Sequence, residues 1–148
     1  MTAKAIYTAR AHVTGGRNEG RGETSDGSLG VELRTPPEMG GEGGGTNPEQ
    51  LFAIGYAACF ESALGVVARR QKLESGDVAI DSGVTLVTGE DRSFTVAVEL
   101  DVTLPSIDDA EEAVGLVRAA HAVCPYSNAT RGNIDVALTA NGQAVDIS

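Results

Sequence analysis

The pattern of apolar and polar positions divides the chain into short strands and two longer helices. Alternation of apolar and polar residues, bounded by glycine-rich turns, is typical of half-buried strands. We expect strands at residues 3–13, 20–25, 29–34, 78–88, 94–104 and 134–140. The pair Asp26-Gly27 favours a tight turn before the third strand, so the first three should form an antiparallel meander.

The first helix has a clear start. Asn47 suits the N-cap, Pro48 suits the first helical position, and Gln50 can complete a capping box. The helix should run to about Lys72, where the apolar pattern ends before a Ser-Gly-Asp break.

The second helix should be capped by Ser106 or Asp108 and should end near Val123. Residues 125–131 then form either a tight turn or a short helix. The resulting order, βββ-α-ββ-α-β, predicts an α+β fold with mostly antiparallel strands. A chain of 148 residues without a wide linker predicts one domain over residues 1–148.

The first helix is apolar around nearly its whole circumference, from residue 51 to 68. Such a helix should be buried on all sides, and one chain of this length has little material to surround it. We therefore expect a homodimer in which a second subunit covers part of it. Gly55 and Gly65 also favour close approach of another backbone. The stretch is as long as a short membrane span, but Glu61 interrupts it, so we predict a core helix and no membrane contact.

Composition excludes several classes of partner. The chain has 11 basic and 21 acidic residues and a net charge of −10, which argues against binding to nucleic acid or to an anionic membrane surface. The glycine-rich segment 35–46 resembles a phosphate-binding loop only superficially, because Thr46-Asn47-Pro48 follows where Gly-Lys-Ser/Thr is required. We interpret it as a mobile connection or lid.

Location follows from the N-terminal residues and the cysteines. Residues 1–20 carry Lys4, Arg10 and Arg17 and no apolar run, so no signal peptide is expected. Two cysteines in 148 residues do not make a disulfide scaffold. We expect a cytoplasmic protein with reduced thiols.

The two cysteines are the candidate chemistry. Cys59 lies in the apolar helix, and Cys124 ends the second helix just before a proline. A buried cysteine is often only core packing, but this pair also fits a nucleophilic thiol with a resolving partner. His121, three residues before Cys124, is a candidate to tune that thiol. With His12 as the only other histidine, no metal site is expected.

Four segments together carry a family resemblance. They are Thr-Gly-Gly-Arg at 14–17, Gly-Thr-Asn-Pro-Glu-Gln-Leu-Phe-Ala at 45–53, Gly-Tyr-Ala-Ala-Cys-Phe at 55–60, and Val-Cys-Pro-Tyr-Ser-Asn-Ala-Thr-Arg-Gly-Asn-Ile at 123–134. In motif order and length the whole chain resembles the organic hydroperoxide resistance branch of the OsmC-like family.

The resemblance implies a thiol-dependent peroxidase and an intertwined homodimer with long central helices wrapped by sheets. It implies that Cys59 is the peroxidatic cysteine, Cys124 the resolving one, and Arg17 and Glu49 the polar pair beside the reactive sulfur. It implies no bound metal or flavin, and a lipoyl group on a carrier protein as the external reductant.

The chemistry explains why such residues are needed. The attacking species is a thiolate, and burial in an apolar helix opposes ionisation of Cys59. A guanidinium from Arg17 would offset that cost, and Glu49 would orient it. Glu49 and Cys59 are ten residues apart on one helix, about 15 Å along its axis and about 80° around it. We therefore expect Glu49 of one subunit to approach Cys59 of the other.

The aromatic residues Phe52, Tyr56 and Phe60 flank Cys59 along the helix. They are either ordinary core residues or an apolar collar that favours alkyl or fatty-acyl hydroperoxides. Three rival functions remain open at this point. One is an OsmC-type peroxidase with a broader peroxide preference, and another is a non-catalytic stress or binding protein of the same fold. A general disulfide oxidoreductase is disfavoured, because no Cys-x-x-Cys motif is present.

Overall fold

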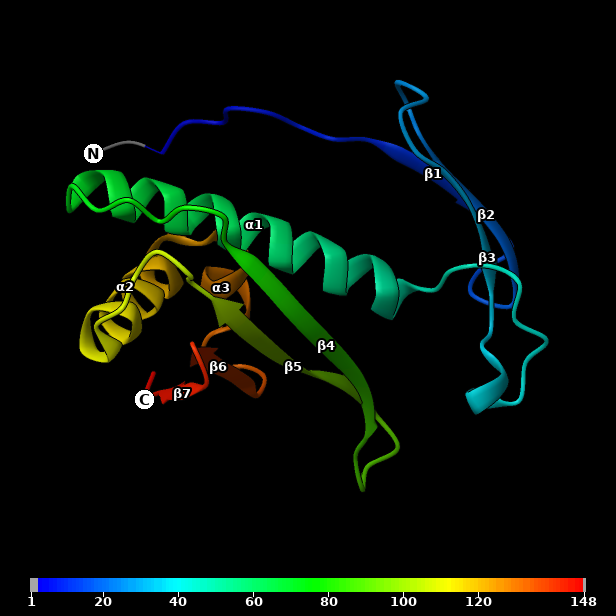
Figure 1. Ribbon diagram of the computed structural model, residues 1–148. Helices are drawn as coiled ribbons and strands as arrows, with labels where there is room; N and C mark the ends of the chain where they lie inside the picture. The colour runs from blue at the N-terminus through cyan, green and yellow to red at the C-terminus, as the bar shows by residue number, and fades with distance from the viewer. Residues whose placement is uncertain (1–2, 148) are drawn as a thin grey trace. The chain divides into compact units, whose positions relative to one another are not determined.

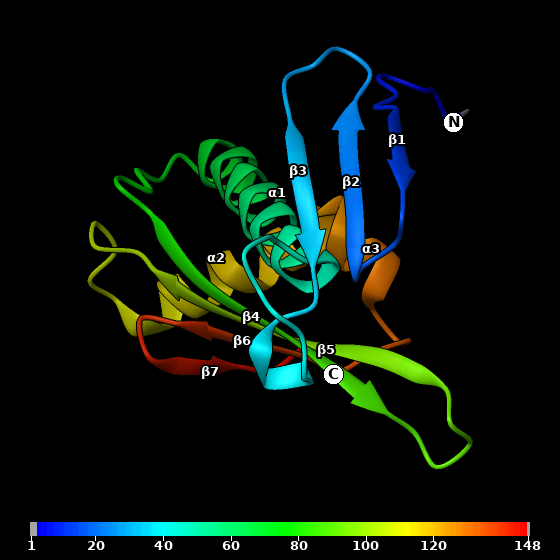
Figure 2. The ribbon, with the colours of Figure 1, turned by 90° about the vertical axis from the view of Figure 1, so that its right-hand side faces the viewer.

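The computed structural model describes residues 3–147, which form two compact units divided after Leu51. The first unit holds a three-stranded sheet, and the second holds a four-stranded sheet with helices (Figures 1 and 2). Helix α1, Pro48–Arg70, starts in the first unit and continues in the second. The α+β class predicted from the sequence is confirmed.

The first unit is an antiparallel meander in the order β1-β2-β3. Its strands are β1 (Ala11–Thr14), β2 (Glu19–Thr24) and β3 (Gly30–Arg34). The predicted turn between β2 and β3 is present: Asp26 Oδ1 accepts hydrogen bonds from the backbone N–H and the hydroxyl of Ser28 at 2.9 and 2.7 Å. Gly27 adopts a positive φ of 75°, which glycine tolerates without steric cost.

The predicted strand over residues 3–13 is wrong for most of its length. Residues 3–10 have no regular structure and are exposed, and β1 begins only at Ala11. A strand needs a neighbour for its backbone groups. The backbone hydrogen bond just before β1 joins Ser25 N–H to Arg10 O. Ser25 follows the last residue of β2, so β2 has ended at this point. Residues 3–10 therefore extend past the end of their only strand neighbour.

The start of α1 agrees with prediction, apart from half of the capping box. Asn47 Oδ1 accepts from Gln50 N–H at 2.9 Å, and Pro48 is the first helical residue. The Gln50 side chain does not return to the cap; its Oε1 accepts from Thr46 Oγ1 at 2.7 Å. The preceding loop contains one short 3₁₀ turn, Pro37–Met39.

The second unit is a sheet in the order β4-β5-β6-β7 packed against helices (Figure 1). Its strands are β4 (Ala79–Thr88), β5 (Phe94–Thr103), β6 (Val136–Ala140) and β7 (Gln143–Val145). All neighbours pair antiparallel except β5 and β6, which run parallel in the register Val98↔Val136. The helices are α2 (Ala110–Val123) and α3 (Pro125–Thr130), so the segment left open as a turn or helix is a helix.

Two details of the second unit differ from prediction. The N-cap of α2 is Asp109, whose carboxylate accepts from the N–H groups of Glu111 and Glu112, rather than Ser106 or Asp108. Strand β7 was not predicted. Its signal is the pair Asn141-Gly142, with φ of 49° and 83°, which is typical of a two-residue hairpin turn between Ala140 and Gln143.

Helix α1 buries one face and not its whole circumference. The buried residues recur at helical spacing: Tyr56, Phe60, Ala63, Leu64, Val67 and Ala68. On the opposite side Ile54 is 70% exposed, and Ala58 and Ser62 are exposed as well. The single chain therefore leaves one face of α1 uncovered, and its burial by a second subunit stays a prediction. By length and composition alone, α1 could also cross a membrane, a test that core helices of soluble proteins pass too.

Asn141 holds the β6–β7 turn against the end of β5. Its side chain accepts from Leu104 N–H at 2.7 Å and donates to the carbonyls of Leu104 and Ile107 at 3.1 and 3.2 Å. Asn141→Ala should lower the free energy of unfolding by about 2–4 kcal/mol, because three partly buried hydrogen bonds are lost. Urea unfolding followed by circular dichroism measures this. Asn133→Ala, at an exposed position, is the control, and an equal loss in both variants would contradict the assignment.

Candidate active site

The second unit brings its two cysteines together. The Sγ atoms of Cys59 and Cys124 lie 3.7 Å apart, although 65 residues separate them in the chain, and both thiols are free. Cys124 is completely buried, whereas Cys59 is partly exposed. Two sulfurs form a disulfide at about 2.05 Å, so a shift of less than about 2 Å would join them. A reagent in solution can therefore reach Cys59, whereas Cys124 is shielded from solvent and can react with Cys59.

Cys124 is placed by the break between α2 and α3. It is the C-cap of α2 and the N-cap of α3, with extended backbone angles of −67° and 125°. The following Pro125 disfavours helical geometry at this position and suits the first position of the next helix. Cys124 N–H still donates to Ala120 O, and Cys124 O accepts from Asn128 N–H, both at 2.9 Å. The thiol therefore lies at a defined corner rather than in a loop.

Aromatic rings lie beside the thiols. The ring centroids of Phe52, Tyr56 and Tyr126 are 5.7–6.0 Å apart in pairs. A side-chain carbon at Gly55 would lie 3.2 Å from Tyr126 Oη, so glycine lets this ring rest against α1. Gly55 was predicted to admit another backbone; in this chain its neighbour is the Tyr126 ring.

The predicted apolar collar needs correction. Tyr56 and Phe60 have no exposed surface and belong to the hydrophobic core, because their side of α1 faces the sheet and the other helices. Phe52 is only partly buried, and Tyr126, which was not predicted for the collar, is 40% exposed. Surface that a substrate could reach is therefore offered by Phe52 and Tyr126.

Burial controls the ionisation of Cys59. Burial raises the pKa of the Cys59 thiol, the backbone N–H of Tyr126 lowers it, and the adjacent Cys124 thiol raises it. The raising effects are larger, so within the second unit the pKa of Cys59 lies above its ordinary value, which favours the protonated thiol. A positive charge near the sulfur would favour the thiolate at Cys59.

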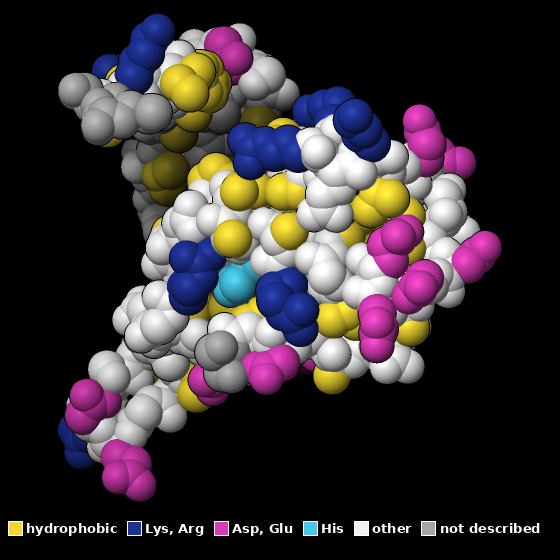
Figure 3. Space-filling model, turned by 90° about the vertical axis from the view of Figure 1, so that its left-hand side faces the viewer, with side chains coloured by type: hydrophobic (Ala, Val, Ile, Leu, Met, Phe, Trp, Pro, Cys, Tyr) yellow, Lys and Arg dark blue, Asp and Glu magenta, His cyan; other side chains and the backbone are white. Residues whose placement is uncertain are grey.

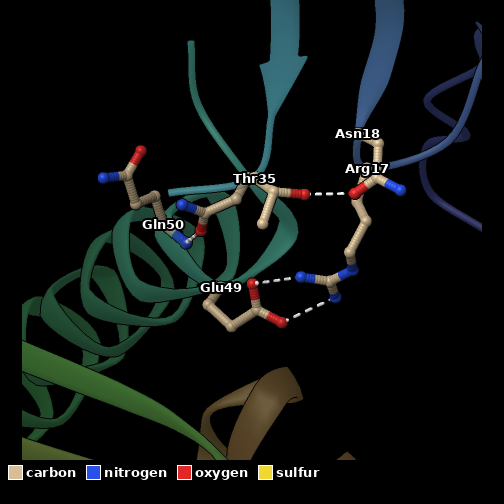
Figure 4. A network of polar contacts seen from close by, with 6 residues as sticks. Arg17, Asn18, Thr35, Glu49 and Gln50 are labelled. Carbon is tan, nitrogen blue, oxygen red and sulfur yellow. Dashed lines mark hydrogen bonds and ion pairs between the residues drawn. The ribbon is translucent and has the colours of Figure 1, made fainter. Parts of the chain in front are cut away.

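The first unit holds the predicted polar pair. Arg17 donates two hydrogen bonds to the Glu49 carboxylate, at 2.8 and 3.1 Å (Figure 4). The hydrogen bonds with Glu49 raise the pKa of Arg17, and those from Arg17 lower the pKa of Glu49. The two-point contact fixes the plane of the guanidinium. Next to this ion pair, the hydroxyl of Thr35 donates a hydrogen bond to the Oδ1 atom of Asn18, which lies in the β1–β2 turn.

Local backbone geometry places both members of this pair. Arg17 follows Gly15 and Gly16, whose positive φ values of 77° and 64° turn the chain out of β1. Glu49 lies in the first turn of α1, where a carboxylate interacts favourably with the helix dipole. The four predicted residues thus form two pairs, one in each unit. That Arg17 and Glu49 act at the thiol pair stays a prediction.

His121 lies among basic residues. On the face drawn in Figure 3, a histidine is flanked by basic side chains, and His121 lines a pocket of about 380 Å³ with Arg118 and Arg131. Burial, and then the charge of Arg131, lower the pKa of His121, so its imidazole is neutral at pH 7. Within residues 3–147, no three His, Cys, Asp or Glu side chains are grouped so that they could hold a metal ion.

The sequence interpretation missed one set of buried hydroxyl groups next to the thiols. Ser127 and Thr130 were treated only as part of a tight turn or short helix, but both are buried in α3 and hydrogen-bonded to the phenol of Tyr56. The available signal was the polar character of a segment that follows a buried cysteine.

Fold and thiol pair together define an α+β protein with two adjacent free thiols, and comparison with known proteins places it in a narrower class. The sequence model of the OsmC-like proteins matches residues 41–139. An organic hydroperoxide resistance protein of Xanthomonas axonopodis pv. citri is 56% identical over 140 residues, covering 92% of this chain and 95% of that protein.

Solved structures agree. One from Legionella pneumophila, described as an organic hydroperoxide resistance protein, has a TM-score of 0.86 and 52% identity, covering 91% of this chain and 97% of that one. Another from Vibrio cholerae, described in the same terms, has a TM-score of 0.91 and 43% identity, covering 98% and 99%. The chain belongs to the OsmC-like family and, within it, to the organic hydroperoxide resistance proteins.

Proposed function

We propose that this protein is a peroxidase that reduces organic hydroperoxides to alcohols. The observation that carries the proposal is the 3.7 Å approach of a partly exposed thiol, Cys59, to a fully buried one, Cys124. A lone structural cysteine needs no such partner. Membership of the organic hydroperoxide resistance proteins supports the same chemistry.

The proposed cycle has three steps. The Cys59 thiolate attacks the distal oxygen of the hydroperoxide, the O–O bond breaks, and the alkoxide takes a proton and leaves as the alcohol. Cys59 is now a sulfenic acid. Cys124 then attacks the Cys59 sulfur, forming the disulfide and releasing water. A dithiol reduces this disulfide through a mixed disulfide and becomes a cyclic disulfide itself.

In this proposal Arg17 supplies the positive charge that favours the Cys59 thiolate, and Glu49 orients it. In our proposal the Arg17 guanidinium stabilises the thiolate and the departing alkoxide, and Glu49 holds the guanidinium in the correct plane. Support comes from the bidentate contact between them and from the raised pKa that burial imposes on Cys59. We further propose that in a dimer Glu49 of one subunit serves Cys59 of the other, because the two residues lie about 15 Å apart along one helix.

The surroundings of the thiols indicate the substrate class, and the family resemblance implies the reductant. Phe52 and Tyr126 present apolar surface, which favours an alkyl or fatty-acyl tail at roughly 0.8 kcal/mol per buried methylene. We propose a lipoyl group on a carrier protein as the external dithiol, with no bound cofactor, and a cytoplasmic location where the disulfide is reduced after each cycle.

The expected substrate preference separates the candidate functions. With dihydrolipoamide as reductant, kcat/KM for cumene hydroperoxide should exceed that for hydrogen peroxide by at least about tenfold, because only the organic substrate buries an apolar tail. Coupled consumption assays measure both values. Equal values would favour an OsmC-type enzyme of broad preference, and consumption of no more than one equivalent would favour a non-catalytic binding protein.

We also propose a homodimer. Residues 3–10 include Ile6 and Tyr7, which are 93% and 81% exposed, and α1 leaves Ile54 uncovered. A second copy could bury both surfaces. Light scattering after size exclusion should give twice the chain mass at micromolar concentration. Ile54→Lys should shift the protein toward monomer, whereas Met39→Lys, at an exposed position in the 3₁₀ turn, should not; a monomeric wild type would contradict the proposal.

A further inference from the structure

A sealed cluster of three hydroxyl groups lies next to the thiols. Tyr56 Oη is 2.8 Å from Ser127 Oγ and 3.2 Å from Thr130 Oγ1, and Thr130 Oγ1 donates to Ser127 O at 3.3 Å. Tyr56 and Ser127 have no exposed surface, and Thr130 is 6% exposed. Water does not compete for these bonds, so each group depends on the others for its partner.

The cluster joins the two segments that carry the sulfurs. Tyr56 lies three residues before Cys59 on α1, so both side chains project from the same side of that helix. Ser127 lies three residues after Cys124, which is the N-cap of α3. The phenol of Tyr56 therefore links α1, which carries Cys59, to α3, which begins at Cys124.

Apart from this cluster, the main side-chain contact between helix α3 and α1 is the ring of Tyr126, which packs against Phe52 and Tyr56. Helix α3 has only six residues, no side chain caps its N-terminus, and its buried residues are Ser127 and Thr130. Both are polar, so no aliphatic side chain of α3 is fully buried in the core. A helix attached by apolar contacts alone can slide, whereas hydrogen bonds to one phenol define both distance and direction.

We propose that Tyr56, Ser127 and Thr130 are positioning residues that hold Cys124 within reach of Cys59 and so set the rate of disulfide formation. The inference rests on the proposed peroxidase cycle. The step concerned is attack of the Cys124 thiol on the Cys59 sulfenic acid: a sulfur–sulfur bond forms, the S–O bond breaks, and the Cys124 proton leaves with the hydroxyl as water. The cluster takes no part in the earlier oxidation of Cys59.

The consequence is a choice between two fates of the sulfenic acid. If Cys124 is held in place, the disulfide forms and the cysteine is recoverable. If it is not, a second hydroperoxide oxidises Cys59 to the sulfinic acid and is itself reduced to the alcohol. Displacement of a reacting group by about 1 Å can cost a hundredfold in rate, so a looser α3 would shift this partition strongly.

The test compares Thr130→Val, Thr130→Ser and Tyr56→Phe with wild type and with Val102→Ala, a core variant in β5 outside the cluster. Each protein is mixed with increasing cumene hydroperoxide, and mass spectrometry measures disulfide against sulfinic acid at Cys59. Tyr56→Phe should slow disulfide formation about ten- to a hundredfold, with a smaller effect of Thr130→Val. Thr130→Ser keeps the hydroxyl and should resemble wild type.

A second measurement removes the dependence on peroxide. An aromatic disulfide reagent, 5,5′-dithiobis(2-nitrobenzoic acid), forms a mixed disulfide with Cys59, and attack by Cys124 then releases a second coloured thiolate. The same variants should slow this second release. If wild-type Cys59 resists cumene hydroperoxide while the release is slowed in the variants, the proposed function fails and the positioning role stands. If Thr130→Val matches Thr130→Ser in both measurements, or Val102→Ala shifts the partition equally, the positioning role is overturned.

Discussion

Replacing Cys59 with serine should abolish turnover of organic hydroperoxide, whereas replacing Cys124 should stop the cycle after its first step. The wild-type protein treated with one equivalent of cumene hydroperoxide should lose two hydrogens by mass and gain an internal Cys59–Cys124 bond. Cys124→Ser should instead carry a sulfenic acid on Cys59 that dimedone traps, because no thiol is left 3.7 Å away to displace it.

The two variants are matched, since each removes one sulfur from the same contact. The Cys59→Ser rate should fall at least about a thousandfold, to that of a free thiol or below, because the buried Cys124 has no access to the peroxide. A dimedone label found on Cys124 would reverse the assigned roles. Residual turnover in Cys59→Ser would show that reduction does not depend on this sulfur.

Features with local causes were readable from the sequence. The start of α1 at Asn47-Pro48 and the turn at Asp26-Gly27 depend on residues within a few positions of each other, and both are present as predicted. The β7 hairpin has an equally local signal in Asn141-Gly142, so its omission was an error of reading and not a limit of the sequence.

Features that depend on distant partners were not readable. Residues 3–10 alternate like a strand, yet β2 ends before it can pair with them. When a helix is apolar around its whole circumference, its sequence does not indicate which face packs against the core. The sequence therefore could not show that Tyr56 and Phe60 face the core while Ile54 faces outward. The hydrogen bond between Tyr56 and Ser127 joins residues 71 positions apart and leaves no periodic pattern in the sequence.

In the candidate site, too, the features with local causes could be predicted from the sequence, and those that depend on distant partners could not. Composition and spacing singled out Cys59 and Cys124 as unusual, but their pairing came from the family resemblance, and the fold then placed their sulfurs together. Arg17 and Glu49 also came from the resemblance, because an arginine in a glycine-rich turn and a glutamate in a first helical turn are ordinary residues separately. Only their bidentate contact distinguishes them from other surface charges.

Replacing Arg17 with methionine should lower the second-order rate constant for oxidation of Cys59 at pH 7 by about 10- to 1000-fold. An opposite charge beside an ionisable group shifts its pKa by about 1–3 units, and loss of that charge reduces the thiolate fraction by the same factor. Burial and the Cys124 thiol already raise the pKa of Cys59 by more than the Tyr126 N–H lowers it, so loss of the guanidinium would leave the thiol protonated. Stopped-flow oxidation by cumene hydroperoxide across a range of pH measures the effect.

The pH dependence of the oxidation rate shows the direction in which Arg17 shifts the pKa of Cys59. In wild type the guanidinium favours the thiolate, so the rate should reach its plateau at lower pH; in Arg17→Met the midpoint should move upward, and the two rates should converge as pH rises above both midpoints. Arg17→Lys keeps the positive charge but loses the two-point hydrogen bonding of the guanidinium, so its midpoint should lie between those of wild type and Arg17→Met. Arg21→Met is the control, since Arg21 also pairs with a glutamate, Glu32, at 2.7 Å in the same sheet but is exposed. An unchanged midpoint in Arg17→Met, or an equal shift in Arg21→Met, would remove Arg17 from the site, and ionisation of Cys59 would then need another source of positive charge.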